Sequence, residues 1–127
     1  MKRLVLASAS PRRRRMLREL GVACTAVTGT FQEMPHARGQ SPARYVQHNA
    51  AAKAKNVAPG FKNALVVGAD TVVVHRGRVL GKPRTQQEAF AYMRMLNGAT
   101  HAVYTGLAII DTADQSVITG YEKTLVT

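Results

Sequence analysis

The sequence predicts one α/β domain, a mixed twisted sheet with flanking helices, over residues 1–127. Three observations support this class. Helix start signals occur at three places, and short apolar segments with strand character lie between them. A continuous apolar run at 65–74 is typical of a central strand covered on both faces. The final part of the chain, 100–127, reads as two strands without a helix between them, so the sheet is not wholly parallel.

The first two elements are a short buried strand and a basic helix. Leu4–Ala7 is apolar, Ser10 is a favourable N-cap, and Pro11 suits the first helical position because its missing N–H has no partner there in any case. The helix therefore runs from Pro11 to Gly21, where glycine ends it.

Four arginines stand at the start of this helix, at positions 12–15. The positive end of the helix dipole attracts anions and disfavours cations, so the arginines conflict with it unless a polyanion binds. Arg13 shares a helix face with apolar residues, and Arg12 adjoins it, which makes these two the candidates for binding phosphate. The alternative is a solvated basic helix end.

The next elements are a strand at 23–28, an irregular stretch through Gln40, and a second helix opened by Ser41-Pro42. The apolar stripe of that helix consists of Val46, Ala50, Ala54 and Val57. Lys53 lies about 60° from the centre of the stripe, where a long side chain reaches a cleft. Pro59-Gly60 ends the helix.

The second half of the chain begins with the central strand, 65–74. A turn at 75–78 predicts a β-hairpin, and Thr85 to Glu88 matches a capping box that starts a helix ending at Gly98. Strands at 100–111 and 116–127 follow, separated by a polar turn.

Asp70 and Lys82 are the candidate functional residues of this half of the chain. An ionised carboxylate within an apolar strand needs a cation, a metal or several hydrogen bonds. The alternative to a functional Asp70 is a structural one, hydrogen-bonded to neighbouring backbone groups beside Gly68. Pro83 keeps Lys82 extended, suited to a phosphate or to Asp70; a solvated lysine is the alternative. Glu33 offers a second carboxylate or a metal ligand.

Eighteen Lys and Arg residues against seven Asp and Glu give a formal charge of +11, which favours phosphate-bearing partners. The few aromatic residues are scattered and none lies among the arginines, so a nucleic-acid partner is not expected. No apolar run approaches the ~20 residues of a membrane span, and the N-terminus does not resemble a signal peptide. We therefore expect a cytoplasmic protein without a membrane partner.

Five segments together resemble the Maf family of nucleoside triphosphate pyrophosphatases. These segments are 8–13 (SASPRR), 50–54 (AAAKA), 68–71 (GADT), 80–83 (LGKP) and 98–106 with its His101 and Thr105-Gly106. The resemblance covers essentially the whole chain in family order. It implies a fold like that of inosine triphosphate pyrophosphatases, dependence on a divalent metal cation such as Mg²⁺ or Mn²⁺, and a possible homodimer. It also implies hydrolysis of a nucleoside triphosphate to the monophosphate and pyrophosphate.

The resemblance also implies a role for each candidate residue. Asp70 matches the family's proton acceptor, which activates water for attack at the α-phosphorus and touches the metal. Glu33 matches an acidic residue of the same cleft and is the second expected metal ligand. The phosphate cleft is lined by residues matching Ser8, Arg13, Lys53 and Lys82. Arg12 and Thr71 stand where the 7-methyl-GTP branch carries tryptophan and glutamine, so the chain resembles the dTTP and UTP branch.

The chain departs from the family pattern at Asn49, where a leucine is common, and at Gln32. The family also continues beyond residues 122–126 into further strands and helices. We therefore expect a C-terminally truncated version of the family fold. Its alternative function is that of a catalytically inactive protein that binds nucleotides or anionic partners.

Overall fold

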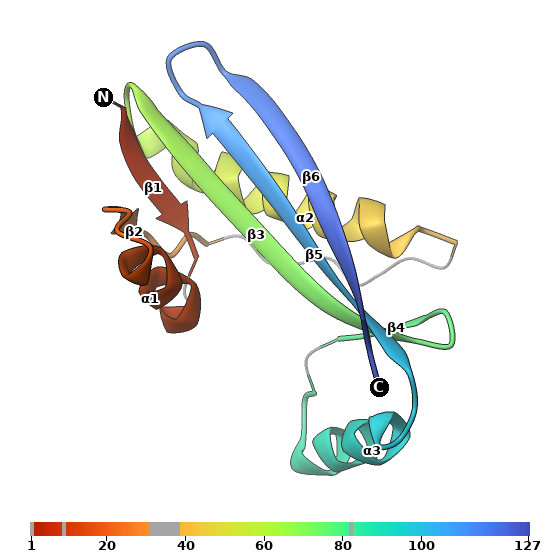
Figure 1. Ribbon diagram of the computed structural model, residues 1–127. Coiled ribbons are helices and arrows are strands. Elements are labelled where there is room, and N and C mark those ends of the chain that lie inside the picture. Colours follow the sequence, from red (N-terminus) through yellow and green to blue (C-terminus); the bar gives the residue numbers. More distant parts are fainter. Residues whose placement is uncertain (1, 9, 31–38, 82) are drawn as a thin grey trace.

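The computed structural model describes residues 2–8, 10–30, 39–81 and 83–127. The elements in chain order are β1 (Arg3–Ala7), α1 (Pro11–Glu19), β2 (Thr25–Ala26), α2 (Pro42–Val57), the 3₁₀ helix η1 (Ala58–Gly60), β3 (Ala64–His75), β4 (Arg78–Leu80), α3 (Gln86–Leu96), β5 (His101–Asp111) and β6 (Ser116–Val126). Within these residues the strands form one sheet in the order β2-β1-β3-β5-β6, and β4 pairs with the far end of β3 (Figure 1). The β1–β3 and β1–β2 pairs are parallel and the others antiparallel, which confirms the predicted mixed sheet.

The helices begin where the capping residues predict. The side chains of Ser10, Ser41 and Thr85 each accept a hydrogen bond from the backbone N–H three residues later. Gly21 has a φ of 78°, in the left-handed region that glycine favours, and α1 ends just before it. The predicted second strand is much shorter than expected, because only Thr25–Ala26 pairs with β1.

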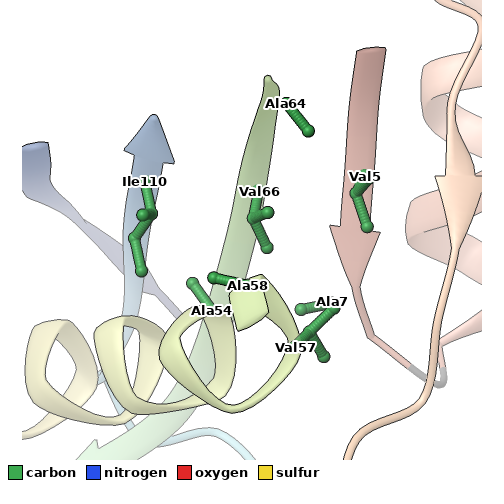
Figure 2. Close-up of a cluster of buried hydrophobic side chains, with 8 residues drawn as sticks. All are labelled: Val5, Ala7, Ala54, Val57, Ala58, Ala64, Val66 and Ile110. Atoms are coloured by element: carbon green, nitrogen blue, oxygen red, sulfur yellow. The ribbon is translucent and has the colours of Figure 1, made fainter. Parts of the chain in front are cut away.

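The core lies between α2 and one face of the sheet (Figure 2). The predicted helix stripe is confirmed, since its four residues are all buried. Ala54 and Val57 pack with side chains of β1, β3 and β5, namely Val5, Ala7, Ala64, Val66 and Ile110. Val46 belongs to a second cluster with Tyr45, Val72, Val74 and Ala102. On the opposite face of β3, Thr71 is exposed and its neighbours are mostly half-buried, so within the described residues the strand is fully covered on one face only.

The other two helices lie away from this core. α1 stands beside β1 and β2, and α3 lies beyond the β4 end of the sheet (Figure 1). Phe90 and Met93, two large apolar residues three positions apart on α3, are 63% and 68% exposed, so the described part of the chain does not bury them. No helix among the described residues combines the length and the apolar character needed to cross a membrane.

Two glycines set the distance between α2 and the sheet. A Cβ atom on Gly68 of β3 would lie 2.1 Å from the carbonyl oxygen of Ala50, and one on Gly106 of β5 would lie 2.4 Å from that of Val46. Real side chains do not tolerate such approaches, so the helix backbone rests directly on both strands only because these positions have no Cβ. This close packing brings short side chains of α2 within reach of β3.

Candidate functional site

Asp70 lies in the middle of β3 and is only 4% exposed. On one edge of β3, pairing with β1 ends at Gly68 and pairing with β4 begins at Val73. Within the described residues, positions 69–72 therefore have a paired strand only on the β5 side. Side chains from α1 and α2 reach this interruption in the sheet, which makes it the candidate site.

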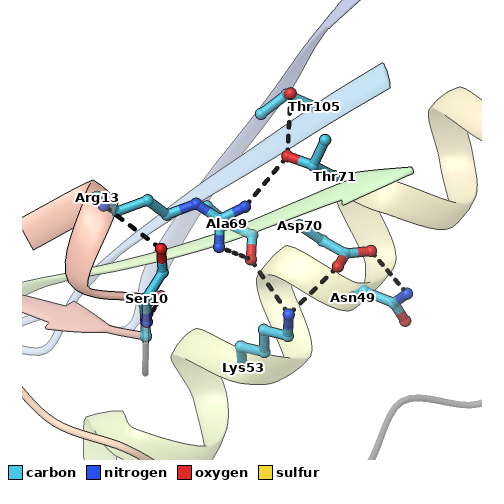
Figure 3. Close-up of polar contacts among 9 residues, drawn as sticks. Ser10, Arg13, Asn49, Lys53, Ala69, Asp70, Thr71 and Thr105 are labelled. Atoms are coloured by element: carbon cyan, nitrogen blue, oxygen red, sulfur yellow. Dashed lines mark hydrogen bonds and ion pairs between the residues drawn. The ribbon is translucent and has the colours of Figure 1, made fainter. Parts of the chain in front are cut away.

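Two side chains of α2 bind the Asp70 carboxylate (Figure 3). The Lys53 ammonium lies 3.2 Å from Oδ1, and the Asn49 amide donates to Oδ2 at 3.0 Å. Asn49 and Lys53 are one helical turn apart, so they lie on the same side of α2 and reach the same carboxylate. A buried carboxylate is stable only with such partners, since water does not solvate it. The prediction that Asp70 has a cationic partner is confirmed.

Arg13 approaches the same segment of β3 from the start of α1 (Figure 3). Its guanidinium donates to the Ala69 carbonyl at 3.5 Å and to the Thr71 hydroxyl at 3.1 Å. The Ala69 carbonyl also accepts a hydrogen bond from Lys53, at 3.3 Å. One backbone oxygen thus connects two cations from two helices. The Thr71 hydroxyl continues the chain of contacts to Thr105 on β5, at 3.1 Å.

The loop between β1 and α1 holds Arg13 in position. The Ser10 hydroxyl accepts a hydrogen bond from the Arg13 backbone N–H at 3.4 Å, and the Ser8 hydroxyl accepts one from the Ser10 N–H at 3.1 Å. Each serine therefore uses its oxygen as an acceptor and keeps its hydroxyl hydrogen for another partner. Together with the positive end of the α1 dipole, these groups favour an anion at the start of α1.

The structure brings together four of the predicted site residues, Arg13, Lys53, Asp70 and Thr71. Ser8 contacts Ser10, the residue that caps the helix carrying Arg13. Arg12 is exposed at the start of α1, and no contact among the described residues assigns it a role. Glu33 and Lys82 lie outside the described residues.

Asn49 is a site residue that the sequence reasoning missed. We treated it as a departure from the family pattern, whereas the structure places it against Asp70 with 1% exposure. Helical spacing is the signal that could have identified it. Position 49 lies one turn before Lys53 and three residues after the buried Val46, so a polar residue there faces the sheet.

The donor set at the site fits a metal only in part. Asp70 supplies a hard oxygen ligand, and the described residues contain no group of three or more His, Cys, Asp or Glu side chains that could hold a metal ion. Mg²⁺ is commonly held by one or two carboxylates together with substrate phosphates. Asp70 therefore suits an ion shared with a phosphate ligand, rather than one enclosed by protein side chains.

A hollow in the described structure lies away from Asp70. It has a volume of about 680 Å³ and lies between the end of α2 and the β5–β6 turn, with Lys55, Phe61 and Lys62 in its lining. Neither Asn49 nor Lys53 lines it, so this hollow is separate from the contacts that these two residues make with Asp70.

A family profile described as Maf-like protein matches residues 3–127. The chain belongs to this family. A relative from Pelotomaculum thermopropionicum, named dTTP/UTP pyrophosphatase, is 48% identical over 126 residues, which are 99% of this chain and 65% of the relative. A relative of the same name from Moorella thermoacetica is 49% identical over 110 residues, 87% of this chain and 56% of the relative. The chain thus spans less than two thirds of the length of these family members.

Solved structures support the fold. The Staphylococcus aureus Ham1 protein matches 98% of this chain with a TM-score of 0.61 at 12% sequence identity, over 70% of its own length. A nucleoside-triphosphatase (dITP/XTP pyrophosphatase) from Mycobacterium abscessus matches 98% with a TM-score of 0.59 at 16% identity, over 73% of its length. The predicted mixed sheet with flanking helices, of the type found in inosine triphosphate pyrophosphatases, is confirmed.

Proposed function

We propose that this protein hydrolyses nucleoside triphosphates to the monophosphate and pyrophosphate, and that dTTP and UTP are its substrates. The observation that carries the proposal is the buried Asp70 carboxylate, held by Lys53 at 3.2 Å and followed along the strand by Thr71, which binds Arg13. This arrangement offers one base beside two cations. The relatives named dTTP/UTP pyrophosphatase support the choice of substrate.

In the proposed reaction, the Asp70 carboxylate accepts a proton from a water molecule as the water oxygen attacks the α-phosphorus. The bond between the α-phosphorus and the oxygen that bridges to the β-phosphate breaks, and pyrophosphate leaves with the electron pair. The triphosphate carries several negative charges, and the ammonium of Lys53 and the guanidinium of Arg13 neutralise part of them. Ser8 and Lys82 add further phosphate donors in this proposal, and Arg12 and Thr71 contribute to the choice of base.

A divalent cation, Mg²⁺ or Mn²⁺, belongs to the proposal. Asp70 would hold it together with Glu33. When bound, such an ion acts as a Lewis acid on a phosphate oxygen. The high positive charge of the chain, +11, suits a polyanionic ligand but does not by itself distinguish a free nucleotide from other anions.

The test is pyrophosphate release from a panel of nucleoside triphosphates by the purified chain with Mg²⁺ or Mn²⁺. We expect release from dTTP and UTP above that from the purine triphosphates. Asp70→Asn keeps the shape of the side chain and removes the base, so release should be lost while nucleotide binding is retained. Asp114→Asn, which changes an acid in the β5–β6 turn, is the matched control and should leave release unchanged.

Two outcomes would contradict the proposal. Equal release by the wild type and Asp70→Asn would remove Asp70 from the reaction. Nucleotide binding without any release by the wild type would instead support the alternative, an inactive nucleotide-binding protein.

We further propose a cytoplasmic location and a homodimer. All eleven residues of β6 are exposed, and one edge of this strand has no partner within the described residues, so it offers backbone groups to a second chain. Light scattering of the purified chain tests the dimer, and a monomer across the micromolar range would contradict it.

A further inference from the structure

We propose that Asn49 is a positioning residue that holds the Asp70 carboxylate in one orientation during the reaction, an inference that rests on the proposed pyrophosphatase function. The amide of Asn49 donates to Oδ2 of Asp70 at 3.0 Å. Asn49 is 1% exposed and Asp70 is 4% exposed. Because neither side chain has bulk water as an alternative partner, the hydrogen bond between them persists.

The two α2 side chains that bind Asp70 differ in what they can do when an anion arrives. Lys53 is charged, and its side chain is 23% exposed, so phosphate oxygens compete with Asp70 for its ammonium. Asn49 is neutral and buried, so an incoming anion gains little by drawing its amide away from a carboxylate. Asn49 therefore keeps Oδ2 in place while Lys53 serves both the carboxylate and the substrate.

This division assigns different roles to the two carboxylate oxygens. Oδ2 is occupied by the Asn49 amide, and Oδ1 lies beside Lys53, the cation that also contacts the Ala69 carbonyl to which Arg13 donates. Oδ1 is thus the oxygen nearer the proposed phosphate site and the one that accepts the proton from water. A carboxylate free to rotate would present either oxygen and spend less time in the productive orientation.

The fold explains how a side chain as short as asparagine reaches the strand. Gly106 on β5 is the direct pairing partner of Asp70, so no side chain stands beside the carboxylate on the α2 face of the neighbouring strand. The Val46 backbone of α2 occupies that space, at the position where a Cβ on Gly106 would lie. Position 49 of α2 is therefore held close enough to Asp70 for a direct hydrogen bond.

The test compares kcat and KM for pyrophosphate release in the wild type and in Asn49→Leu, which removes the donor and continues the apolar stripe. We expect kcat to fall about 10- to 100-fold, with KM within about twofold of the wild type, because the carboxylate is misoriented while the cations remain. The matched control is Asn56→Leu. Asn56 lies on the same helix but bonds to Thr30, so its loss should leave kcat unchanged. A kcat for Asn49→Leu within about twofold of the wild type, or equal losses in both variants, would overturn the inference.

A second comparison separates positioning from folding. Asn49→Asp places two carboxylates side by side and should lower the midpoint of thermal unfolding. Asn49→Asp combined with Asp70→Asn restores a hydrogen bond between an amide and a carboxylate, with its direction reversed. We expect the double variant to recover the midpoint without recovering turnover, since the base is no longer on the strand. A midpoint that is not recovered would contradict the direct contact. If the wild type releases no pyrophosphate, the proposed function fails, and the midpoints still decide whether Asn49 holds residue 70.

Discussion

The packing of α2 against β3 makes a quantitative prediction about Gly68→Ala. The added Cβ would lie 2.1 Å from the Ala50 carbonyl oxygen, whereas ordinary van der Waals contact begins at 3.4 Å. The helix or the strand must therefore move by about 1.3 Å, because both contacting groups are backbone. Adding this displacement to the 3.2 Å between Lys53 and Asp70 gives about 4.5 Å, beyond the range of an ion pair.

The free-energy cost follows from two opposing effects. Overpacking of this kind destabilises the folded state by about 1–3 kcal/mol. Replacing glycine by alanine in a strand stabilises it by about 0.5–1 kcal/mol, because the unfolded chain has less conformational freedom. Weakening the buried Lys53–Asp70 pair adds to the loss. We expect a net destabilisation of about 2 kcal/mol or more.

Urea unfolding followed by circular dichroism measures this difference. The matched control is Gly120→Ala in β6, where an added Cβ meets nothing within 4 Å, so its stability should change by less than about 1 kcal/mol. If Gly68→Ala unfolds at the same urea concentration as Gly120→Ala, the close contact between α2 and β3 does not set the position of the helix, and the reasoning is refuted.

Three further predictions concern single side chains. Lys53→Met removes the cation beside buried Asp70 and should lower the unfolding free energy by about 2–4 kcal/mol in urea titrations; a loss below about 0.5 kcal/mol would contradict the pair's role. Ser10→Ala removes the α1 cap and should cost about 1 kcal/mol in thermal unfolding, whereas Ser10→Asp, also a capping residue, should cost less; equal losses would argue against capping. The pKa of the Asp111 carboxyl lies below its ordinary value of 3.8, chiefly because Lys2 donates a hydrogen bond to it. Its stabilising effect is present above the unfolded-state pKa and is lost as the pH falls through the lower folded-state pKa. In Asp111→Asn the unfolding free energy should therefore depend less steeply on pH between about pH 5 and pH 2. The same pH dependence in the variant and the wild type would disprove this.

Much of the fold follows from local chemistry that the sequence displays. The Ser10 and Ser41 caps, each followed by proline, start α1 and α2 where predicted, since capping depends on residues a few positions apart. The hairpin between β3 and β4 forms at Arg76-Gly77, both with positive φ. The prediction was less accurate for β2, where only two residues pair, because strand length depends on the partner strand rather than on local preference.

The candidate site was predictable only in part. Asp70 was identifiable as an acid in an apolar run, and Lys53 as a long side chain at the rim of a helix stripe. Helical spacing could show only that Asn49 faces the sheet, because a polar residue on a helix has no assigned partner until the opposing strand is known. The exposure of Phe90 and Met93 on α3 likewise depends on what packs against that helix, which periodicity does not reveal.

The sequence by itself determined where helices begin, which residues form the buried stripe of α2, and the excess of positive charge that suits a phosphate ligand. Only the tertiary structure decided that Arg13 meets β3, 56 residues away, and that Asn49 and Lys53 bind opposite oxygens of one carboxylate. The physical reason is the direct contact of α2 with Gly68 and Gly106. The depth of that contact depends on how separate segments pack, and it sets which side chains of the helix can reach Asp70.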